Sequence, residues 1–292
     1  MSLLQAILLG IVQGLTEFIP VSSTAHLVLT SRVMNLTLTP EQLTSSIAVI
    51  QLGTLVAVVV YFAGDIWNIT RAFIHDHFSL LKNGRRDHSN RTNISGRLSH
   101  EAWLGWLVII GSLPVAVVGL AFKKQIEGTF TKNLWVIATM MIVVALLLAI
   151  AEAVGKKQRC MQELGVGDAL AVGLAQCLAL VPGSSRSGST IMAGLFAGEM
   201  RATAARFSFL LSIPAIAASG LLELKEALHR LPHGNLTTLA VGTIVSAVVG
   251  YASIWFLLRY LRTHTTGVFI GYRLIVGGAI LIMLVNGRIS PL

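Results

Sequence analysis

A polar stretch near the amino end gathers residues that can do chemistry. Gln13 and Glu17 stand four positions apart, so on a helix they share one face and can offer two oxygen ligands to a hard cation such as Mg²⁺. Hydroxyl and imidazole side chains follow the helix-ending Pro20, at Ser22, Ser23, Thr24 and His26. A hydroxyl near an imidazole suggests a nucleophile and its base, or a histidine that activates water or protonates a leaving group. The spacing does not choose between these roles.

A second polar stretch, PGSSRSGST at 182–190, surrounds Arg186 with four serines and a threonine. Its glycines let the backbone approach a ligand, and its hydroxyls supply donors around one guanidinium. Phosphate suits such a cradle, because the planar fork of arginine donates to it in bidentate fashion. The apolar stretch that begins at Ile191 can present helix amides to the same anion. This pattern predicts an oxyanion site.

Each of these residues also has a structural interpretation. Glu17 could be paired with a basic residue that holds helices together, His26 could be a satisfied core histidine, and the hydroxyls of 22–24 could simply cap the next helix. Arg186 could snorkel, although its polar neighbours argue against this. All three ionisable residues fall within apolar sequence, where an unpaired charge is costly, and this favours a functional site.

The elements that carry these residues must be membrane helices. Of the 292 residues 54% are hydrophobic and only 12% are charged, whereas soluble domains carry about a quarter charged residues. Apolar runs long enough to span the hydrocarbon core predict transmembrane helices at 46–64, 103–122, 134–151, 207–222, 237–258 and 268–287. The last of these contains Arg273, which we expect to snorkel toward an interface.

The net charge of +9 is best explained by membrane topology, not by nucleic-acid binding. Most of the Lys and Arg residues stand in the loops 65–101, 155–167, 199–206 and 259–267, which the positive-inside rule assigns to the cytoplasm. We interpret 65–101 as a solvated polar connector. The first twelve residues hold no Lys or Arg, so we expect no cleaved signal peptide. Cys160 and Cys177 have no spacing typical of a disulfide framework or a metal site.

The two polar stretches interrupt runs too short to cross a bilayer and resemble each other. Gln13, Leu15 and PVSS from Pro20 match Gln176, Leu178 and PGSS from Pro182. The sequence therefore predicts one all-α polytopic membrane domain, with about six transmembrane helices and two re-entrant hairpins in inverted-topology repeats, 1–154 and 165–292. Hairpins entering from opposite faces would meet near the midplane and form one site.

Several motifs together resemble the undecaprenyl-diphosphate phosphatase family of bacteria, also known for bacitracin resistance. They are QGLTEFIPVSSTAH at 13–26, IQLG at 50–53, PGSSRSGST at 182–190 and FSFLL at 207–211, in an order that runs through most of the chain. Gln13 is a permitted variant where the family allows Glu or Gln, although an amide should hold a cation less strongly. Ala25 replaces a common glycine.

The resemblance implies hydrolysis of undecaprenyl diphosphate to the monophosphate and inorganic phosphate, which recycles the lipid carrier for peptidoglycan synthesis and confers bacitracin resistance. It implies a divalent cation, Mg²⁺ or Ca²⁺, and a multi-pass protein of the bacterial inner membrane whose site opens toward the periplasm. The implied roles are metal binding by Gln13 and Glu17, catalysis by Glu17, Ser23, His26 and Arg186, and phosphate binding by Ser22, Thr24, Gln51, Ser185, Ser187 and Thr190.

A lipid-carrier flippase or transporter is the alternative, because inverted repeats with broken helices are also a transporter design. It accounts less well for an acid, hydroxyls and an imidazole in one break and an arginine among serines in the other. The sequence leaves open whether a phosphoserine forms or water attacks directly. It predicts no nucleic-acid partner and leaves the oligomeric state open, with a homodimer among the assemblies it allows.

Overall fold

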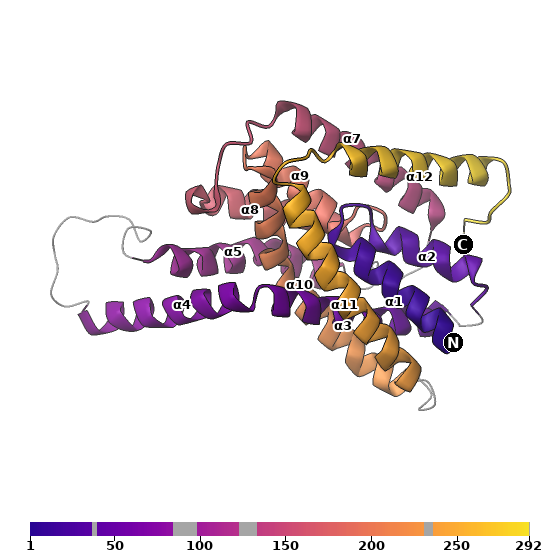
Figure 1. Ribbon diagram of the computed structural model, residues 1–292, viewed down its shortest axis with the longest axis horizontal. Helices are drawn as coiled ribbons and strands as arrows, with labels where there is room; N and C mark the ends of the chain where they lie inside the picture. The colour runs from indigo at the N-terminus through magenta and orange to yellow at the C-terminus, as the bar shows by residue number, and fades with distance from the viewer. Residues whose placement is uncertain (37–39, 84–97, 123–132, 231–235, 292) are drawn as a thin grey trace.

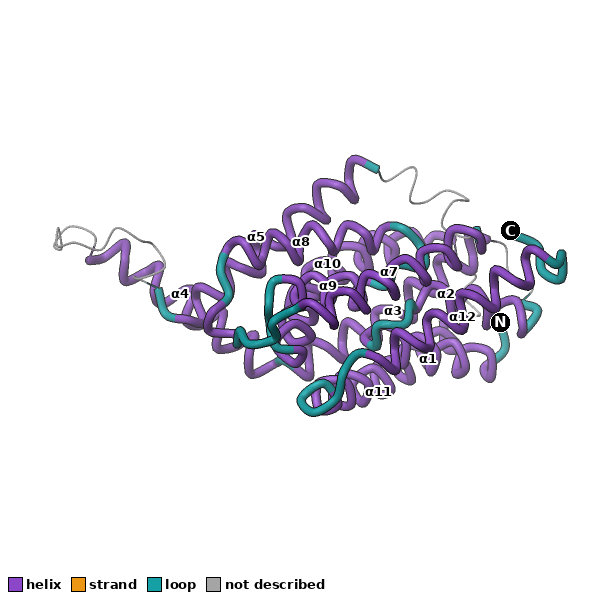
Figure 2. The backbone as a smooth tube through the Cα atoms, turned by 90° about the horizontal axis from the view of Figure 1, so that it is seen from above, coloured by secondary structure: helices purple, strands orange, loops and turns teal. Residues whose placement is uncertain are grey.

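The protein is built from helices, as a computed structural model that describes residues 1–36, 40–83, 98–122, 133–230 and 236–291 shows (Figures 1 and 2). In these ranges no β-strand forms, and one isolated bridge joins Arg159 to Glu199. The helices are α1 (Leu3–Phe18), α2 (Ser23–Val33), α3 (Pro40–Tyr61), α4 (Ala63–Asn83), α5 (His100–Ala121), α7 (Leu134–Val154), η3 (Met161–Glu163), α8 (Val166–Gln176), η4 (Cys177–Leu180), α9 (Arg186–Phe196), α10 (Arg201–Arg230), α11 (Leu236–Tyr260) and α12 (Gly267–Val285).

In the described part of the chain, six helices are long and apolar enough to cross a bilayer, as predicted. They contain the segments Gln42–Tyr61, His100–Ala121, Leu134–Val154, Arg201–Gly220, Thr237–Tyr260 and Gly267–Val285. Large apolar side chains on their outer faces are exposed, such as Val117 of α5, Val248 of α11 and Ile275 of α12. Such a surface suits lipid and not water, so the chain is a multi-pass membrane protein.

The prediction of a solvated connector at 65–101 is wrong for its first part, because α4 occupies Ala63–Asn83. Ile66, Ile69 and Phe73 are spaced by three and four residues, so they form one apolar face among charged neighbours. That face packs on α5, where the position of a Cβ on Gly105 would lie 3.1 Å from both Ile69 and Phe73. Figure 1 shows α4 and α5 running together away from the other helices. Residues 84–97 lie outside the described part of the chain.

Two helical hairpins, α1–α2 and α8–α9, follow the same plan. Their helices begin at Leu3 and Val166, and then at Ser23 and Arg186, with a separation of 163 positions in both cases. Helices α2 and α9 both contain 11 residues. Neither α1 nor the Val166–Leu180 segment is long enough to be counted among the six spans. The match supports the predicted duplication, while entry of the hairpins from opposite faces stays a prediction.

The turns that flank α2 and α9 repeat with the same separation. Ser22 and Ser185 are the N-caps, and both have positive φ, 79° and 67°. After the helices, Asn35 and Gly198 also have positive φ, and the next residue closes each turn, Leu36 N to Ser31 O at 3.1 Å and Glu199 N to Gly194 O at 2.9 Å. The matching of Pro20 with Pro182 is therefore one residue out of register, because the counterpart of Ser22 is Ser185 and not Ser184.

The packing of the hairpins on later helices is exchanged between the two halves. Helix α1 lies along α11, and α8 lies along α5. Gly10 and Gly173, again 163 positions apart, allow these close approaches, because a Cβ would lie 2.4 Å from Gly242 O in the first case and 2.2 Å from Gly111 O in the second. Helices α3 and α10 also pair, as do α7 and α12. Each half therefore completes the other, as expected of paired repeats.

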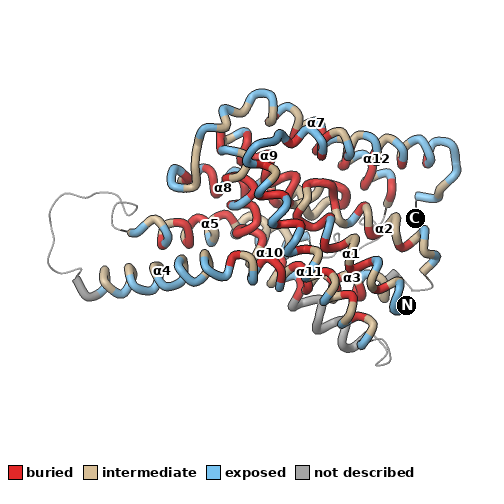
Figure 3. The backbone as a smooth tube through the Cα atoms, viewed as in Figure 1, coloured by how far each residue is buried: buried red, intermediate tan, exposed pale blue. Residues whose placement is uncertain are grey.

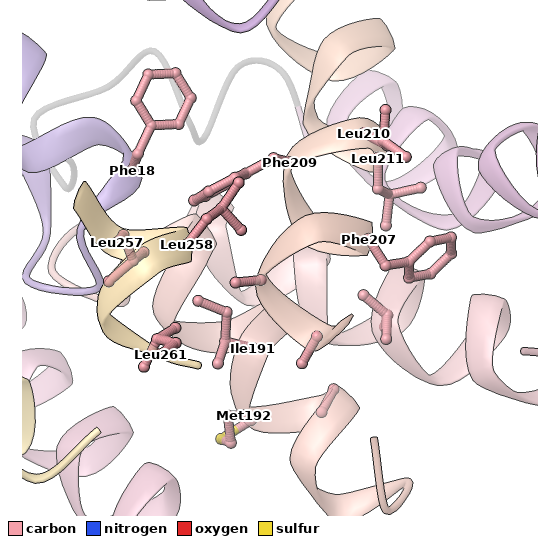
Figure 4. Close-up of a cluster of buried hydrophobic side chains, with 14 of the residues drawn as sticks. Phe18, Ile191, Met192, Phe207, Phe209, Leu210, Leu211, Leu257, Leu258 and Leu261 are labelled. Carbon is pink, nitrogen blue, oxygen red and sulfur yellow. The ribbon is translucent and has the colours of Figure 1, made fainter. Parts of the chain in front are cut away.

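The core lies where the hairpins meet α10 and α11. Figure 3 shows buried residues concentrated in the middle of the molecule and exposed residues along α4. Phe18 at the end of α1 meets Phe209 of α10 edge to face, with ring centroids 5.3 Å apart. Ile191 and Leu257 belong to the same cluster (Figure 4). This packing fixes the ends of α1 and the start of α9, from which the polar residues project.

Candidate active site

The polar breaks of both hairpins line one cavity of about 310 Å³, which we call the shared cavity. Helices α3, α5 and α10 complete its wall. Apolar side chains such as Ile47, Val115 and Ile216 stand beside the polar ones, so the cavity suits a ligand that has both a polar and an apolar part. The polar side chains in its lining are those of Gln13, Glu17, Ser22, Ser23, Thr24, Gln51, Gln176, Ser185, Arg186 and Ser219.

Glu17 is the link between the two hairpins. Its Oε1 accepts a hydrogen bond from Arg186 Nη2 at 3.0 Å, and its Oε2 accepts one from Gln13 Nε2 at 2.9 Å. The Glu17 side chain is 7% exposed and that of Arg186 is 13% exposed. Breaking such a buried ion pair leaves an uncompensated charge, which is strongly destabilising. The pairing interpretation of Glu17 therefore holds, and its partner is the predicted anion-binding arginine.

Arg186 has unused donor capacity in the cavity. Its Nη1 is buried and has no hydrogen-bond partner among the described residues. Arg186 is also the first residue of α9, whose first-turn amides have no intrahelical partners. A guanidinium with a free nitrogen beside a helix N-terminus is suited to an oxyanion.

The N-caps of α2 and α9 hold strained backbone at the cavity wall. Ser22 Oγ accepts from Ala25 N at 3.5 Å, and Ser185 Oγ accepts from Gly188 N at 3.1 Å. The capping interpretation of the first hydroxyl run is thus confirmed for Ser22. Positive φ at a serine costs of order 1 kcal/mol or more and persists only where the surrounding structure enforces it. Two such residues at one cavity point to a functional requirement for these turns.

His26 is held by contacts on both ring nitrogens and does not line the shared cavity. Nδ1 lies 2.7 Å from Ser22 O, and because a carbonyl only accepts, Nδ1 carries the hydrogen. Nε2 lies 2.6 Å from the Tyr272 hydroxyl, which then donates to it. The two rings are also stacked, with centroids 5.5 Å apart. Sequence reasoning missed Tyr272, because it stands in α12, 246 positions away.

Ser187 and Thr190, predicted to bind phosphate, also lie outside the cavity lining. Ser187 Oγ donates to Ile19 O at 3.3 Å and is 3.2 Å from Ser185 Oγ. Thr190 Oγ1 donates to Arg186 O at 2.8 Å and is 2.5 Å from Ser208 Oγ. These contacts hold the second break in shape. The hydroxyl residues of the cavity lining are Ser22, Ser23, Thr24, Ser185 and Ser219.

From the sequence we expected Arg273 to snorkel toward an interface. This prediction is wrong, because Arg273 is completely buried. Within the described residues its guanidinium donates to backbone carbonyls alone, including Pro20 O at 3.3 Å, Gly183 O at 3.0 Å and Ser184 O at 3.1 Å. It therefore joins the turns of both hairpins from behind. A charge in the middle of an apolar span was a sign of such a role, but its partners are distant in sequence.

The donor set at Glu17 fits a divalent cation of the Mg²⁺ type. Magnesium commonly takes one or two carboxylates together with substrate phosphate oxygens. Glu17 supplies one carboxylate, and rotating the Gln13 amide would turn its oxygen toward the same point. No group of three or more His, Cys, Asp or Glu side chains gathers here or at any other place in the described chain. A cation here would therefore depend on oxygens from the substrate.

Comparison with known families and proteins points in one direction. A family model described as bacitracin resistance protein BacA matches residues 6–279. The undecaprenyl-diphosphatase of Syntrophobacter fumaroxidans is 50% identical over 285 residues, which cover 97% of this chain and 98% of that protein. The undecaprenyl-diphosphatases of Mycolicibacterium gilvum and Chlorobaculum tepidum are 46% and 44% identical, and both alignments cover the whole of each chain.

Proposed function

The chain belongs to the bacitracin resistance protein BacA family, and we propose that its shared cavity is the active site of an undecaprenyl-diphosphatase. The enzyme hydrolyses undecaprenyl diphosphate to undecaprenyl phosphate and inorganic phosphate. This activity recycles the lipid carrier used in peptidoglycan synthesis, and it is the basis of bacitracin resistance. The flippase alternative is not favoured.

One observation carries the proposal: Arg186 from the second hairpin and Glu17 from the first meet in a single cavity, with Arg186 Nη1 left unpartnered among the described residues. A free guanidinium nitrogen at a helix N-terminus selects an anion. The apolar part of the lining suits the first isoprene units of a lipid whose diphosphate enters the cavity. A soluble cleft would expose such a tail to water.

In the mechanism that we propose, Arg186 and the first amides of α9 bind the terminal phosphate. They also stabilise the charge that develops on its oxygens during attack. Ser23 begins α2 and lines the cavity, which makes its hydroxyl the candidate nucleophile. Thr24, Ser22, Ser185 and Gln51 supply further donors from the cavity wall. A bound divalent cation, held by Glu17 and Gln13, would neutralise charge on the diphosphate.

His26 manages the proton in this proposal. With Nδ1–H bonded to Ser22 O, Nε2 is the ring nitrogen that carries the lone pair and can accept a proton. This lone pair accepts the hydrogen bond of the Tyr272 hydroxyl, so during the reaction Tyr272 either moves aside or passes the proton on. Tyr272 is thereby a positioning residue for the base.

Site orientation and assembly extend the same proposal. From the charge distribution of the loops we propose that the hairpin α1–α2 lies on the outer side and that the cavity opens toward the periplasm. Three candidate spans, in α3, α5 and α7, lie between the hairpins, and an odd number of crossings would bring the second hairpin in from the cytoplasm. The enzyme acts in the inner membrane, and a homodimer stays one of the assemblies to test.

Purified protein in detergent micelles, supplied with undecaprenyl diphosphate and Mg²⁺, should release phosphate. A chelator should abolish release, and added Mg²⁺ should restore it. Binding of the substrate without any release above background would contradict the proposal. Release that continues unchanged in the chelator would remove the metal from it while leaving the phosphatase activity in place.

A further inference from the structure

Gln176 carries a buried amide that makes no hydrogen bond within the described residues. It ends α8 and is 0% exposed, and neither Nε2 nor Oε1 has a hydrogen-bond partner among the described residues. Buried polar groups in native proteins are nearly always bonded, because an unsatisfied one forfeits the hydrogen bonds it made to water. Gln176 nevertheless lines the shared cavity, so the missing partner can come from a ligand.

The first hairpin shows what Gln176 lacks. Its counterpart is Gln13, 163 positions earlier, and Gln13 Nε2 donates to Glu17, one turn further along α1. The residue one turn after Gln176 is Leu180, the counterpart of Glu17. Both hairpins therefore place a glutamine in the lining of the cavity, but only the first supplies a carboxylate to receive a hydrogen bond from it.

Two of the unpartnered atoms belong to cavity-lining residues and have the same hydrogen-bonding character. Arg186 Nη1 and Gln176 Nε2 are both donors, both are buried, and both belong to residues that line the same cavity. Gln176 Oε1 is unpartnered as well, but it is an acceptor, so the two nitrogens are the groups that call for an anion. A diphosphate offers several charged acceptor atoms. Hydrogen bonds to a charged acceptor are stronger than those between neutral groups.

We propose that Gln176 binds an oxygen of the substrate diphosphate together with Arg186, as a further substrate-binding residue. This inference rests on the proposed function. It assigns the two equivalent glutamines different tasks: Gln13 is bonded to Glu17 at the metal site, whereas Gln176 donates to the anion. The two roles differ because the residue one turn after Gln13 is Glu17, which accepts its hydrogen bond, whereas the residue one turn after Gln176 is the apolar Leu180.

The first test is the kinetics of Gln176→Met, which keeps the length of the side chain and removes its polar atoms. We expect KM for undecaprenyl diphosphate to rise about 10-fold to 100-fold, as for the loss of a hydrogen bond to a charged group. The inhibition constant of inorganic pyrophosphate should rise in parallel. A KM within twofold of the wild-type value would overturn the proposal.

The second readout is the Tm of the substrate-free protein. Replacing an unpartnered buried amide with an apolar side chain should leave Tm unchanged or raise it by a few degrees. A large fall in Tm, or failure to fold, would show that the amide has a structural partner, and this too would overturn the proposal. Binding that weakens while stability holds is the signature of a ligand contact.

Two variants complete the design. Ser246→Ala removes a different buried polar group, a hydroxyl that also has no partner in the described chain. Because Ser246 does not line the cavity, KM should not change. Gln176→Glu places a carboxylate beside the diphosphate, and its KM should exceed that of Gln176→Met. A KM at or below the wild-type value in Gln176→Glu would refute an anionic ligand. If the wild-type protein itself releases no phosphate above background, the proposed function is refuted instead.

Discussion

The two hairpins share a backbone plan but carry different chemistry at equivalent positions. Where the first hairpin has Glu17 the second has Leu180, and where the first helix after the break begins with Ser23 the second begins with Arg186. The glutamines Gln13 and Gln176 are the same, as are the capping serines Ser22 and Ser185. Duplication thus supplies two strained turns and two helix N-termini. Divergence gives one hairpin the carboxylate of Glu17 and the other the guanidinium of Arg186.

This divergence explains why the halves attract each other across the cavity. Two identical hairpins related by a two-fold axis would bring like charges together, either two carboxylates or two guanidinium groups, and like charges repel. With Glu17 on one hairpin and Arg186 on the other, the contact becomes an ion pair of 3.0 Å. The asymmetry also fits the proposed function, in which Arg186 binds the anion and Glu17 lies opposite to it.

The largest effect is expected from removing the charge that only the second hairpin carries. Arg186→Ala should lower kcat/KM about 10²-fold to 10³-fold or more, because it removes transition-state contacts and leaves Glu17 unpaired. Glu17→Ala should also lose activity by orders of magnitude. Phosphate release measured over a range of substrate concentrations gives both values.

Arg206 offers a matched control for Arg186. It lies in the same half and pairs with Asp65 at 2.6 Å, but this pair is largely exposed and outside the cavity. Arg206→Ala should therefore keep near-normal turnover. Near-normal turnover in Arg186→Ala or in Glu17→Ala would show that the active site lies elsewhere.

A smaller loss is expected at the equivalent position of the first hairpin. Ser23→Ala should reduce kcat about 100-fold, since it removes the candidate nucleophile or a hydroxyl that orients water. Ser31→Ala in the same helix is the control, because its hydroxyl bonds only to Val28 O in the described contacts. Mass spectrometry of quenched reactions decides the route: phosphoserine at Ser23 indicates covalent catalysis, and substantial turnover by Ser23→Ala indicates attack by water.

The turns that follow α2 and α9 show a second divergence, at Leu36 and Glu199. Glu199 is fully buried, and neither of its carboxylate oxygens has a partner among the described residues. Burial, followed by the nearby charge of Asp168, raises the pKa of Glu199 from 4.5 to about 7, although Arg159 opposes the shift. The apolar Leu36 carries no such cost.

The smallest effect, one on stability alone, should follow from this raised pKa. The folded state binds the proton of Glu199 more tightly than the unfolded state does. The stability that protonated Glu199 contributes is therefore complete below pH 4.5 and is lost as the pH rises through 7. The loss is about 3 kcal/mol at full ionisation. The Tm of Glu199→Gln relative to wild type should therefore increase between pH 5 and pH 8. A pH-independent difference would contradict the assignment.

Much of the site was predictable because its residues stand close together in sequence. Helical spacing places Gln13 and Glu17 on one face, and a charge within apolar sequence marks Arg186. The helix α4 was missed because the His and Asn residues of 65–101 suggested a loop, although Ile66, Ile69 and Phe73 repeat with helical spacing. The one-residue register error arose from matching two prolines, whereas the conserved feature of the backbone is the positive φ at Ser22 and Ser185.

The sequence by itself determined the membrane class, the six spans, the two breaks and their resemblance to a known family. These depend on local composition and spacing, which set helix formation and transfer into lipid. Only the tertiary structure decided which polar groups meet: Glu17 with Arg186, Tyr272 with His26, and Arg273 with both turns. Those partners are 169, 246 and up to 253 positions apart, and no local pattern encodes contacts that arise only when helices pack.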